Sequence, residues 1–541
     1  MGRRRAINEP RRRLRRAVRS VRARERAVEE EYSEFVPARR DSEVLARSRA
    51  GQAQIERRSP TRIVTISFIT AIAIGTILLL LPGMRVGGID TPLGVALFTA
   101  TSAVCVTGLT VVDTATFWTP LGQVVILLLI QVGGFGIQAL GTLWIMLLNR
   151  RLGATSRLLA QTETGAMTPG EVRRTLQALA VITIIVEAAV ALMLWLRFML
   201  SYGEPAGTAA WHAVFHSISA FNNAGFALQS DSLMTFGHDF FVLAPISAAI
   251  VIGGLGFLVV VELFARATGE RGLLPHRRWK PMSPEQVVAR GRELARRSKY
   301  RLGGLHPERF GFGNPIPLSL HTRLTLIGTG IAMVVGAVGF ALFEWRNPST
   351  LGTLPWWERL VQSVFSGAIT PRTAGFNTVD YASVQGETRF LTDGLMFTGA
   401  SSGSTAGGVK VTTIVVLAVA VRAEIRGHKD VNVLDRRIPE GVVRIAIAVV
   451  MVSLAAIMAG TMALIYLTDL TLDRALFEVV SALATVGLSA NVTPTLPEGA
   501  QLMLVGLMLL GRVGPLTLVS SLSLRTSPRA YRLPPGQPMI G

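Results

Sequence analysis

The residues that could bind an ion are four glycines, each at the same point of a repeated template. In every copy a phenylalanine is followed ten positions later by a glycine, and then by leucine or phenylalanine. The four pairs are Phe98 and Gly108, Phe215 and Gly225, Phe365 and Gly375, and Phe477 and Gly487. An internal repeat of this kind indicates that one structural unit occurs several times in the chain.

Glycine at these positions is suited to presenting backbone carbonyl oxygens to a cation. Because it lacks a Cβ atom, the backbone can aim carbonyls at one axis and leave room beside an ion. Rings of carbonyl oxygens replace the hydration shell of potassium in selective filters. Any one of these glycines fits better as a packing residue between membrane helices. Four glycines in register favour a cation-selective filter.

The elements that must position this filter are membrane helices. Of the 541 residues, 50% are hydrophobic and 17% charged, and the mean hydropathy is +0.43, which is too apolar for a soluble chain. A helix needs about 20 apolar residues to cross the hydrocarbon core. Eight segments qualify: 63–84, 118–148, 176–200, 240–264, 324–343, 391–421, 442–467 and 502–524. The single cysteine, Cys105, excludes an internal disulfide.

Each pair of these segments encloses a shorter, half-apolar stretch that cannot span a membrane. The four stretches are 93–104, 208–221, 356–369 and 473–483. A short helix that stops at a glycine inside the membrane leaves carbonyls unpaired, which is tolerable only beside protein or a water-filled cavity. The negative C-terminal ends of such helices also favour a cation. The sequence therefore predicts an all-α integral membrane fold: four M1–pore helix–M2 repeats around a pseudo-fourfold pore axis, with eight transmembrane helices and four half-spanning pore helices.

These segments divide the chain. We expect a basic cytoplasmic N-terminal tail (1–61), pore unit 1 (62–149), pore unit 2 (150–268), a basic cytoplasmic linker (269–321), pore unit 3 with an intramembrane gating loop (322–425), pore unit 4 (426–524) and a cytoplasmic C-terminal tail (525–541).

The formal net charge of +20 is foremost an orientation signal. Basic residues gather in the N-terminal tail, in 150–174, 266–323 and 422–444, and at the C-terminal end, whereas the intervening loops carry far fewer. Because cytoplasmic loops are the basic ones, both termini are expected to be cytoplasmic, and nucleic acid is not an expected partner. The opening residues lack the features of a secretory signal. The tail is expected to be a solvated or frayed helix, with contact to anionic lipid or a partner as the alternative.

The sixth apolar segment is interrupted by the sequence FTGASSGSTAGGVKVTT at 397–413. This stretch is rich in glycine and serine and holds Lys410, so a straight helix is not expected. One interpretation is a small-residue helix interface; the other is an unwound loop beneath the filter that obstructs the pore until it moves. Its place in the third unit favours the second. A phosphate-binding P-loop is excluded, because Val409 separates Gly408 from Lys410.

Two charged residues inside apolar segments require partners, because an unpaired charge at mid-membrane is costly and commonly marks a transport pathway. Arg512 is centred in its segment, and a gating role is favoured over a structural ion pair. For Glu187, a buried structural pair or a position lining a wet crevice is at least as well supported as transport chemistry.

Five motifs together resemble the membrane subunit of the Trk/Ktr/HKT potassium-transporter superfamily, and in particular its bacterial Ktr-type branch. They are TATSAVCVTGLTVVDT, NNAGF, TPRTAGFNT, TVGLS and GSTAGGVK, and the resemblance covers about residues 61–524. It implies a single potassium pathway, a homodimer with one pore per subunit, and a cytoplasmic ring of nucleotide-binding regulatory subunits that controls opening. The arginine-rich tail departs from the family core, and no extra hydrophobic helix pair precedes the first unit.

The same resemblance implies the site residues. Potassium would bind backbone carbonyls of a filter made of Val106, Thr107, Gly108, Asn223, Ala224, Gly225, Thr373, Ala374, Gly375, Thr485, Val486 and Gly487. Gating would involve Gly399, Gly403, Ser404, Thr405, Gly407, Gly408 and Lys410, with Arg512 as the partner of the loop. Within this loop Ala400 and Ser402 replace residues that are often Gly and Pro in relatives.

The predicted function is gated, potassium-selective uptake across the bacterial inner membrane, with sodium coupling or sodium activation left open. No covalently bound cofactor is expected, and membrane lipids surround the protein. The alternative is a cation carrier that works by alternating access, which should show paired inverted halves. An enzyme is not expected, because no set of nucleophile, base and orienting group can be found among the motifs. Each filter holds one glycine rather than TVGYG, which predicts some leak of sodium.

Overall fold

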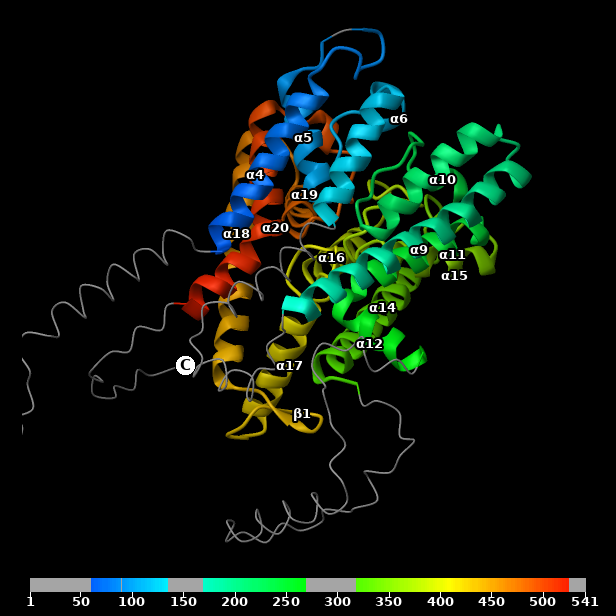
Figure 1. Ribbon diagram of the computed structural model, residues 1–541. Helices are drawn as coiled ribbons and strands as arrows, with labels where there is room; N and C mark the ends of the chain where they lie inside the picture. The colour runs from blue at the N-terminus through cyan, green and yellow to red at the C-terminus, as the bar shows by residue number, and fades with distance from the viewer. Residues whose placement is uncertain (1–59, 89, 135–168, 269–317, 525–541) are drawn as a thin grey trace, which may run out of the picture. The chain divides into compact units, whose positions relative to one another are not determined.

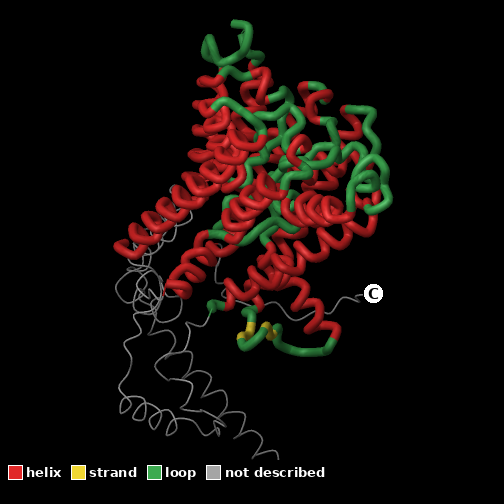
Figure 2. Tube along the Cα trace, turned by 90° about the vertical axis from the view of Figure 1, so that its right-hand side faces the viewer, coloured by secondary structure: helices red, strands yellow, loops and turns green. Residues whose placement is uncertain are grey.

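The described part of the chain is mostly helical, with loops between the helices (Figures 1 and 2). The structure is a computed structural model and describes residues 60–88, 90–134, 169–268 and 318–524. The chain divides into two compact units, Met1–Ile63 and Val64–Gly541. Only the start of helix α4 is described in the first unit. The predicted N-terminal and C-terminal tails and most of the linker lie outside the described residues.

Long apolar helices form the frame of the second unit. They are α9 (Pro169–Ser201), α14 (Leu320–Glu344), α18 (Glu440–Leu467) and α20 (Glu498–Leu524), and α4 (Pro60–Leu79) enters the unit at Val64. Three described stretches are long and apolar enough to cross a membrane: Gln177–Ser201, Leu320–Glu344 and Glu440–Leu467. A fourth candidate is a bent pair described below. The second predicted segment is described only as the helix Pro120–Gly134.

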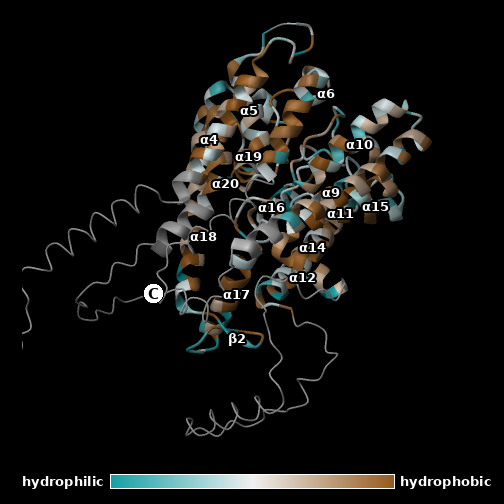
Figure 3. Cartoon of the chain, viewed as in Figure 1, coloured by the Kyte–Doolittle hydropathy of each residue, from teal (hydrophilic) through white to brown (hydrophobic). Residues whose placement is uncertain are grey.

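These helices consist largely of hydrophobic residues (Figure 3), and many of the large hydrophobic side chains are exposed. On α18, for example, the side chains of Met451, Met458 and Met462 are 60%, 68% and 72% exposed. Large apolar side chains on a helix surface are expected where the surrounding medium is lipid and not water. The length and surface of the helices together indicate a multi-pass membrane protein.

Four shorter helices occupy the predicted half-length stretches to within two residues at each end. They are α5 (Leu93–Val104), α10 (Ala206–Phe221), α15 (Trp356–Gln362) continuing as the π-helix η4 (Ser363–Ile369), and α19 (Leu472–Ala484). The first three follow a proline, which cannot continue a preceding helix. The template phenylalanines anchor them: Phe98, Phe215, Phe365 and Phe477 are at most 2% exposed.

The fourth apolar segment is broken, whereas the sequence predicts one continuous span over 240–264. Helix α11 (Phe240–Leu255) ends at Gly256, and α12 (Phe257–Thr268) leaves at an angle of 106°. Gly256 has a φ of +82°, a conformation that residues with a Cβ rarely adopt. The glycines of the sequence IGGLGF make this break possible.

The sixth segment is interrupted, as predicted. Helix α16 (Gly386–Phe397) is followed by a non-helical stretch, residues 398–410, and then by α17 (Val411–Ile425). We refer to this stretch as the 398–410 loop. A parallel bridge joins Thr398 to Val409, and the amide of Val411 donates to the carbonyl of Ala400 over 3.1 Å.

The remaining elements are short. They are α6 (Thr114–Phe117), η1 (Met234–Phe236), η5 (Thr493–Thr495) and the strands β1 (Asn432–Val433) and β2 (Arg436–Arg437). The two strands pair in antiparallel fashion, with Asn432 opposite Arg437 and Val433 opposite Arg436, in the connection between α17 and α18.

Candidate functional site

The four glycines of the template lie together in a closed ring. We call residues 106–108, 223–225, 373–375 and 485–487 the first to fourth glycine segments. A Cβ atom added to any of the four glycines would lie within 3.0 Å of a carbonyl oxygen of another segment. These contacts run from Gly108 to Ala224, from Gly225 to Ala374, from Gly375 to Val486, and from Gly487 back to Thr107. Each segment therefore touches the next in chain order, and the fourth touches the first.

The backbone at the start of each glycine segment is left-handed. The φ angle is 55° at Val106, 58° at Asn223, 65° at Thr373 and 51° at Thr485. This conformation is unusual for the β-branched valine and threonine and implies that the surrounding structure enforces it. Strained backbone of this kind is concentrated at ligand clamps and active sites.

The backbone amides of the glycine segments point back to the short helices. The Thr107 amide donates to the carbonyl of Ser102 over 2.7 Å. In the same way, the amides of Ala224 and Val486 donate to the carbonyls of Ser219 and Ser481 over 2.8 and 2.9 Å. In the third segment the Ala374 amide donates to the carbonyl of Thr370, which is four residues back and not five, because the helix ends in a π-helical turn. No described residue donates a hydrogen bond to the carbonyls of the first two residues in any segment.

The ring is sealed from bulk solvent within the described structure. Residues of the four segments that carry a side chain are at most 1% exposed. The hydroxyls of Thr107, Thr373 and Thr485 are buried and have no hydrogen-bond partner among the described residues. Because buried polar groups are nearly always paired, orphaned hydroxyls and carbonyls at one place indicate room for a polar or ionic partner.

The 398–410 loop is attached to the break between α11 and α12. The amides of Ser401 and Thr405 donate to the carbonyls of Gly254 and Gly253 over 3.1 and 3.4 Å, and the amide of Phe257 donates to the carbonyl of Gly403 over 3.2 Å. The broken helix thus supplies the partners that the loop, as irregular backbone, requires.

The same loop lies directly against the fourth glycine segment. A Cβ on Gly407 would collide with the side chain of Thr485, and one on Gly408 would lie 3.3 Å from the Ala484 side chain. Gly399 faces the carbonyl of Gly407, and the Ser404 hydroxyl donates to the Ser401 carbonyl over 2.7 Å. The predicted gating residues other than Arg512 therefore share one loop, which contacts the ring through Gly407 and contacts Ala484, directly before the fourth segment, through Gly408.

Two cations donate to carbonyls of the loop, one from another helix and one from within the loop. The guanidinium of Arg512, on α20, donates to the carbonyl of Thr405 and, over 3.3 Å, to that of Gly133. The Lys410 ammonium donates to the Ala406 carbonyl over 2.7 Å. Within the described residues no carboxylate forms an ion pair with Arg512. Its hydrogen bonds go to backbone carbonyls, one in the loop and one at Gly133, and not to an acidic partner.

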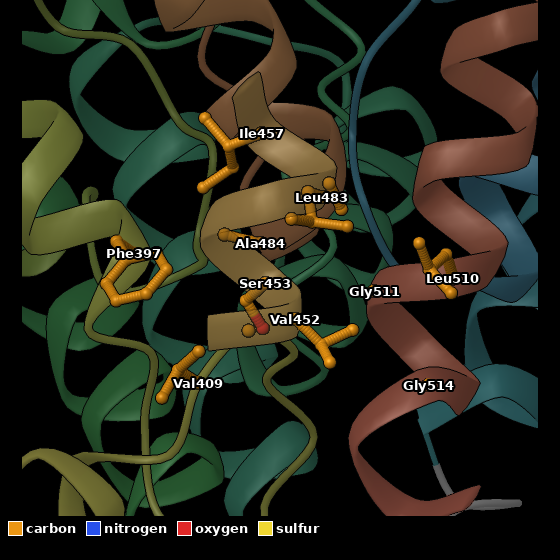
Figure 4. Close-up of a pocket in the computed structure, with 12 residues that line it drawn as sticks. Phe397, Val409, Val452, Ser453, Ile457, Leu483, Ala484, Leu510, Gly511 and Gly514 are labelled. Atoms are coloured by element: carbon orange, nitrogen blue, oxygen red, sulfur yellow. The ribbon is translucent and has the colours of Figure 1, made fainter. Parts of the chain in front are cut away.

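A cavity of about 30 Å³ separates the loop from α18 and α20 (Figure 4). Its lining is almost entirely apolar and includes Val409 of the loop, Ile457 of α18 and Leu510 of α20. A cavity that binds benzene is about 150 Å³, so this space is too small for an organic ligand. It leaves room for a small movement of Val409.

Glu187, on α9, is bound by side-chain amides. Gln131 and Asn222 each donate to its carboxylate, over 3.2 and 3.3 Å, and Asn222 also donates to Gln131 over 2.8 Å. No cationic partner of Glu187 occurs among the described residues. Because Asn222 immediately precedes the second glycine segment, this network supports the base of that segment.

Glu478 is a buried acid that the sequence analysis missed. It follows the template residue Phe477 and is fully buried. Its carboxylate accepts hydrogen bonds from the Ala490 amide over 3.1 Å, from the Thr493 hydroxyl over 2.8 Å and from the Ser489 hydroxyl. It therefore fixes the chain that follows the fourth glycine segment. A charge directly after the template phenylalanine is the signal that could have found it.

Arg372 was also missed. It immediately precedes the third glycine segment, is 6% exposed, and donates from Nη2 to the Thr329 hydroxyl over 3.3 Å. Its Nη1 atom has no partner among the described residues. Arg372 is the charged residue of the motif TPRTAGF, and this charge directly before the third glycine segment is the signal that could have found it.

Apolar outer surfaces, several membrane-length helices and a buried ring of backbone carbonyls define a multi-pass membrane protein with a site suited to cations. The family model TrkH, described as a cation transport protein, matches residues 41–274 and 320–528, and the chain belongs to this family. The family is one of membrane cation transporters and not of enzymes, as predicted.

Individual relatives agree with this family. The chain is 35% identical to the Ktr system potassium uptake protein B of Bacillus subtilis (strain 168), over 90% of this chain and 97% of the relative. It is 34% identical to the protein of the same description from Vibrio alginolyticus, over 89% and 94%. The Potassium/sodium uptake protein NtpJ of Enterococcus hirae is 30% identical, over 90% and 98%. The predicted resemblance to the Ktr-type branch is confirmed.

The fold also resembles a solved structure. The crystal structure of the potassium transporter TrkH from Vibrio parahaemolyticus matches with a TM-score of 0.62 and 19% identity, over 85% of this chain and 84% of that chain. At this identity the likeness concerns the fold alone, and it agrees with a mostly helical membrane architecture.

Proposed function

We propose that this protein takes up potassium across the bacterial inner membrane through a gated pore, whose selectivity filter is the ring of four glycine segments. Four M1–pore helix–M2 repeats would surround a pseudo-fourfold axis, with eight transmembrane helices and the four short helices as half-spanning pore helices. The potassium-uptake relatives, at 34–35% identity over nearly their whole length, support the choice of ion.

The observation that carries the proposal is the closed ring itself. Four left-handed turns bring carbonyls without donors to one buried place, and each glycine touches the next segment so closely that no Cβ fits. Carbonyl oxygens in rings replace the water shell of a dehydrated cation. The negative C-terminal ends of the four short helices favour a cation at the same place.

The 398–410 loop is proposed as the gate. It lies against the fourth glycine segment; Arg512 of α20 holds it there through the Thr405 carbonyl, and Lys410 braces it internally through the Ala406 carbonyl. Two fixed positive charges beside the pathway oppose the passage of cations while the loop is docked. Movement of the loop would open the path, displace Lys410 and break the contact with Arg512.

The energy that drives uptake and the control of the gate come from outside the chain. A membrane potential of 100 mV is worth about 2.3 kcal/mol per charge, which concentrates potassium roughly fiftyfold. We propose that both termini are cytoplasmic, that two copies form a homodimer with one pore each, and that a ring of nucleotide-binding subunits governs the loop. Sodium would act as an activator or a coupled ion, and the Potassium/sodium uptake protein among the relatives supports a place for sodium.

The test is potassium uptake in bacterial cells that lack their own uptake systems. Wild type, Gly375→Ser, Arg512→Ala and the control Gly330→Ala are compared, with and without a regulatory partner. Gly375→Ser is expected to lose potassium preference, because φ is +70° and a Cβ would meet the Val486 carbonyl. Arg512→Ala is expected to transport faster without the partner. Gly330 faces open space, so its variant should behave as wild type.

An alternating-access carrier is the competing function. If the wild type stays inert even with a partner, or if Gly375→Ser changes nothing, the filter assignment is wrong and the carrier becomes the better explanation.

A further inference from the structure

Two aspartates occupy the same place in the first and third copies of the template. Asp113 lies five residues after Gly108, and Asp380 lies five residues after Gly375. Each accepts two hydrogen bonds from its own copy, from an amide two residues on and a hydroxyl three residues on. The donors are Ala115 and Thr116 to Asp113, over 3.0 and 2.8 Å, and Ala382 and Ser383 to Asp380, over 2.9 Å each.

Each aspartate also accepts a hydrogen bond from the neighbouring copy. The Ser230 hydroxyl donates to Asp113 over 2.5 Å, and the Asn491 amide donates to Asp380 over 2.8 Å. Ser230 follows the second glycine segment and Asn491 follows the fourth. The first copy is thus linked to the second, and the third to the fourth, by the same device.

Between the second and third copies the described link is of a different kind. The amide of Leu233 donates to the carbonyl of Asn377 over 2.9 Å, and the amide of Asn377 donates to the Ser232 hydroxyl over 3.1 Å. No carboxylate takes part. The aspartate link is therefore a specific feature of two contacts and not a general property of these loops.

We propose that Asp113 and Asp380 are positioning residues that set the preference for potassium over sodium. The inference rests on the proposed function. Hydrogen bonds within each copy hold the chain that leaves the glycine, for example from the Ser102 hydroxyl to the Leu109 carbonyl, but they do not set the distance between neighbouring copies. The cross-links act on that distance. A ring that fits potassium must resist contraction around the smaller sodium ion, and tying neighbouring segments together supplies that resistance.

The two carboxylates have a second effect because they keep their charge available. Both are half-buried, and no lysine or arginine among the described residues forms an ion pair with them. Each carboxylate lies five residues after a glycine of the ring, and a negative charge near a low-dielectric cation path raises the local concentration of cations. The cross-link acts on the preference between ions, whereas the charge acts on the apparent affinity for them. Variants that remove only one of the two can therefore separate these effects.

The test compares initial rates of potassium and sodium uptake by the full-length protein in cells that lack their own potassium uptake. Ser230→Ala and Asn491→Gly remove the cross-link donors and keep both carboxylates; glycine is used because Asn491 has a φ of +60°. The matched control Thr116→Ala removes a donor to Asp113 that comes from the same copy. Asp113→Asn and Asp380→Asn keep hydrogen-bonding capacity but remove the charge. The amount of each variant in the membrane is measured by immunoblot.

Removing a cross-link donor is expected to lower the potassium-to-sodium uptake ratio about fivefold, the factor that one ordinary hydrogen bond supports. Ser230→Thr, which keeps the hydroxyl, should restore the ratio, and Thr116→Ala should leave it unchanged. The two asparagine variants should keep the ratio but raise KM for potassium several-fold, less so at high ionic strength.

The inference is overturned if an active wild type and both donor variants share one ratio, or if Thr116→Ala changes the ratio as much as Ser230→Ala. A wild type that takes up neither ion refutes the potassium function itself, and with it any role of these links in selectivity.

Discussion

Replacing Gly256 by alanine should release the 398–410 loop. Gly256 has a φ of +82° and a ψ of 149°, a region that is essentially restricted to glycine. An added Cβ would also lie 2.8 Å from the carbonyl oxygen of Ser402, within the loop. The backbone strain and the close contact both destabilise the state in which the loop is attached to the bent helix. A loosened bend relieves both of them, so the released state is favoured.

The size of the effect follows from the backbone strain. A residue held in such a conformation costs about 1–3 kcal/mol, and a middle value of about 2 kcal/mol changes an equilibrium roughly thirtyfold. If about 1% of molecules have a released loop, a thirtyfold shift raises this fraction to about one quarter. Uptake without a regulatory partner should rise by more than tenfold.

The assay is the initial rate of potassium uptake without a partner, normalised to the protein in the membrane. Gly330→Ala is the matched control, since Gly330 lies in α14 with open space around it. Hydrogen exchange of the purified protein gives a readout independent of transport: the amides of Ser401 and Thr405, bonded to the broken helix, should exchange faster in the variant. Unchanged uptake together with unchanged exchange would refute attachment of the loop to this bend.

Three further predictions concern buried or partly buried acids. Asp239→Asn should lower the thermal midpoint by an amount worth about 1 kcal/mol, since it keeps a capping side chain on α11 but removes the ion pair with Arg197, 2.8 Å away. Burial raises the pKa of Asp239, but hydrogen bonds from Arg197, Tyr202 and the Phe241 amide lower it by more, so the folded pKa is below the ordinary value. The stabilisation is therefore complete above the unfolded pKa, about 3.9, and is lost as pH falls through the lower folded pKa, an acid step that the variant should lack. Glu187→Gln should keep uptake near wild type because an amide can still bind Gln131, whereas Glu187→Leu should slow it; equal damage in both would mean that the charge matters. Glu478→Ala should lower the midpoint by an amount worth about 2–3 kcal/mol, since it leaves buried donors unpaired, and Glu478→Gln by less.

Helix positions could be predicted from the sequence wherever apolar length decided them. The short helices were found because a half-length apolar stretch follows from the chemistry of the membrane, and the template phenylalanine marks where each packs. The break at Gly256 could not be found in this way. Hydropathy is the same for a straight and a bent apolar segment, and the partners that make the bend tolerable come from the 398–410 loop, far away in the chain.

The candidate site shows the same limit. Glycines in register predicted a shared cation site, but not that each glycine touches the next in chain order, because contact order depends on packing. The shared continuation to Asp113 and Asp380 was visible as a repeat, yet its meaning depended on Ser230 and Asn491, which lie in copies that lack the aspartate. A residue whose partner comes from a different copy cannot be understood by comparing copies alone.

The differences among the four copies explain why the proposed gate can exist. A ring of identical subunits would place four identical loops below the filter, whereas one chain can give each copy a separate task. Here the second copy supplies the broken helix, the third the loop that attaches to it, and the fourth Arg512, which binds the Thr405 carbonyl. The ring needs similarity, because each glycine must fit against the next. The gate needs difference, because a single loop must be held on one side by backbone hydrogen bonds and on another by a charge, so that weakening either contact alone shifts the loop.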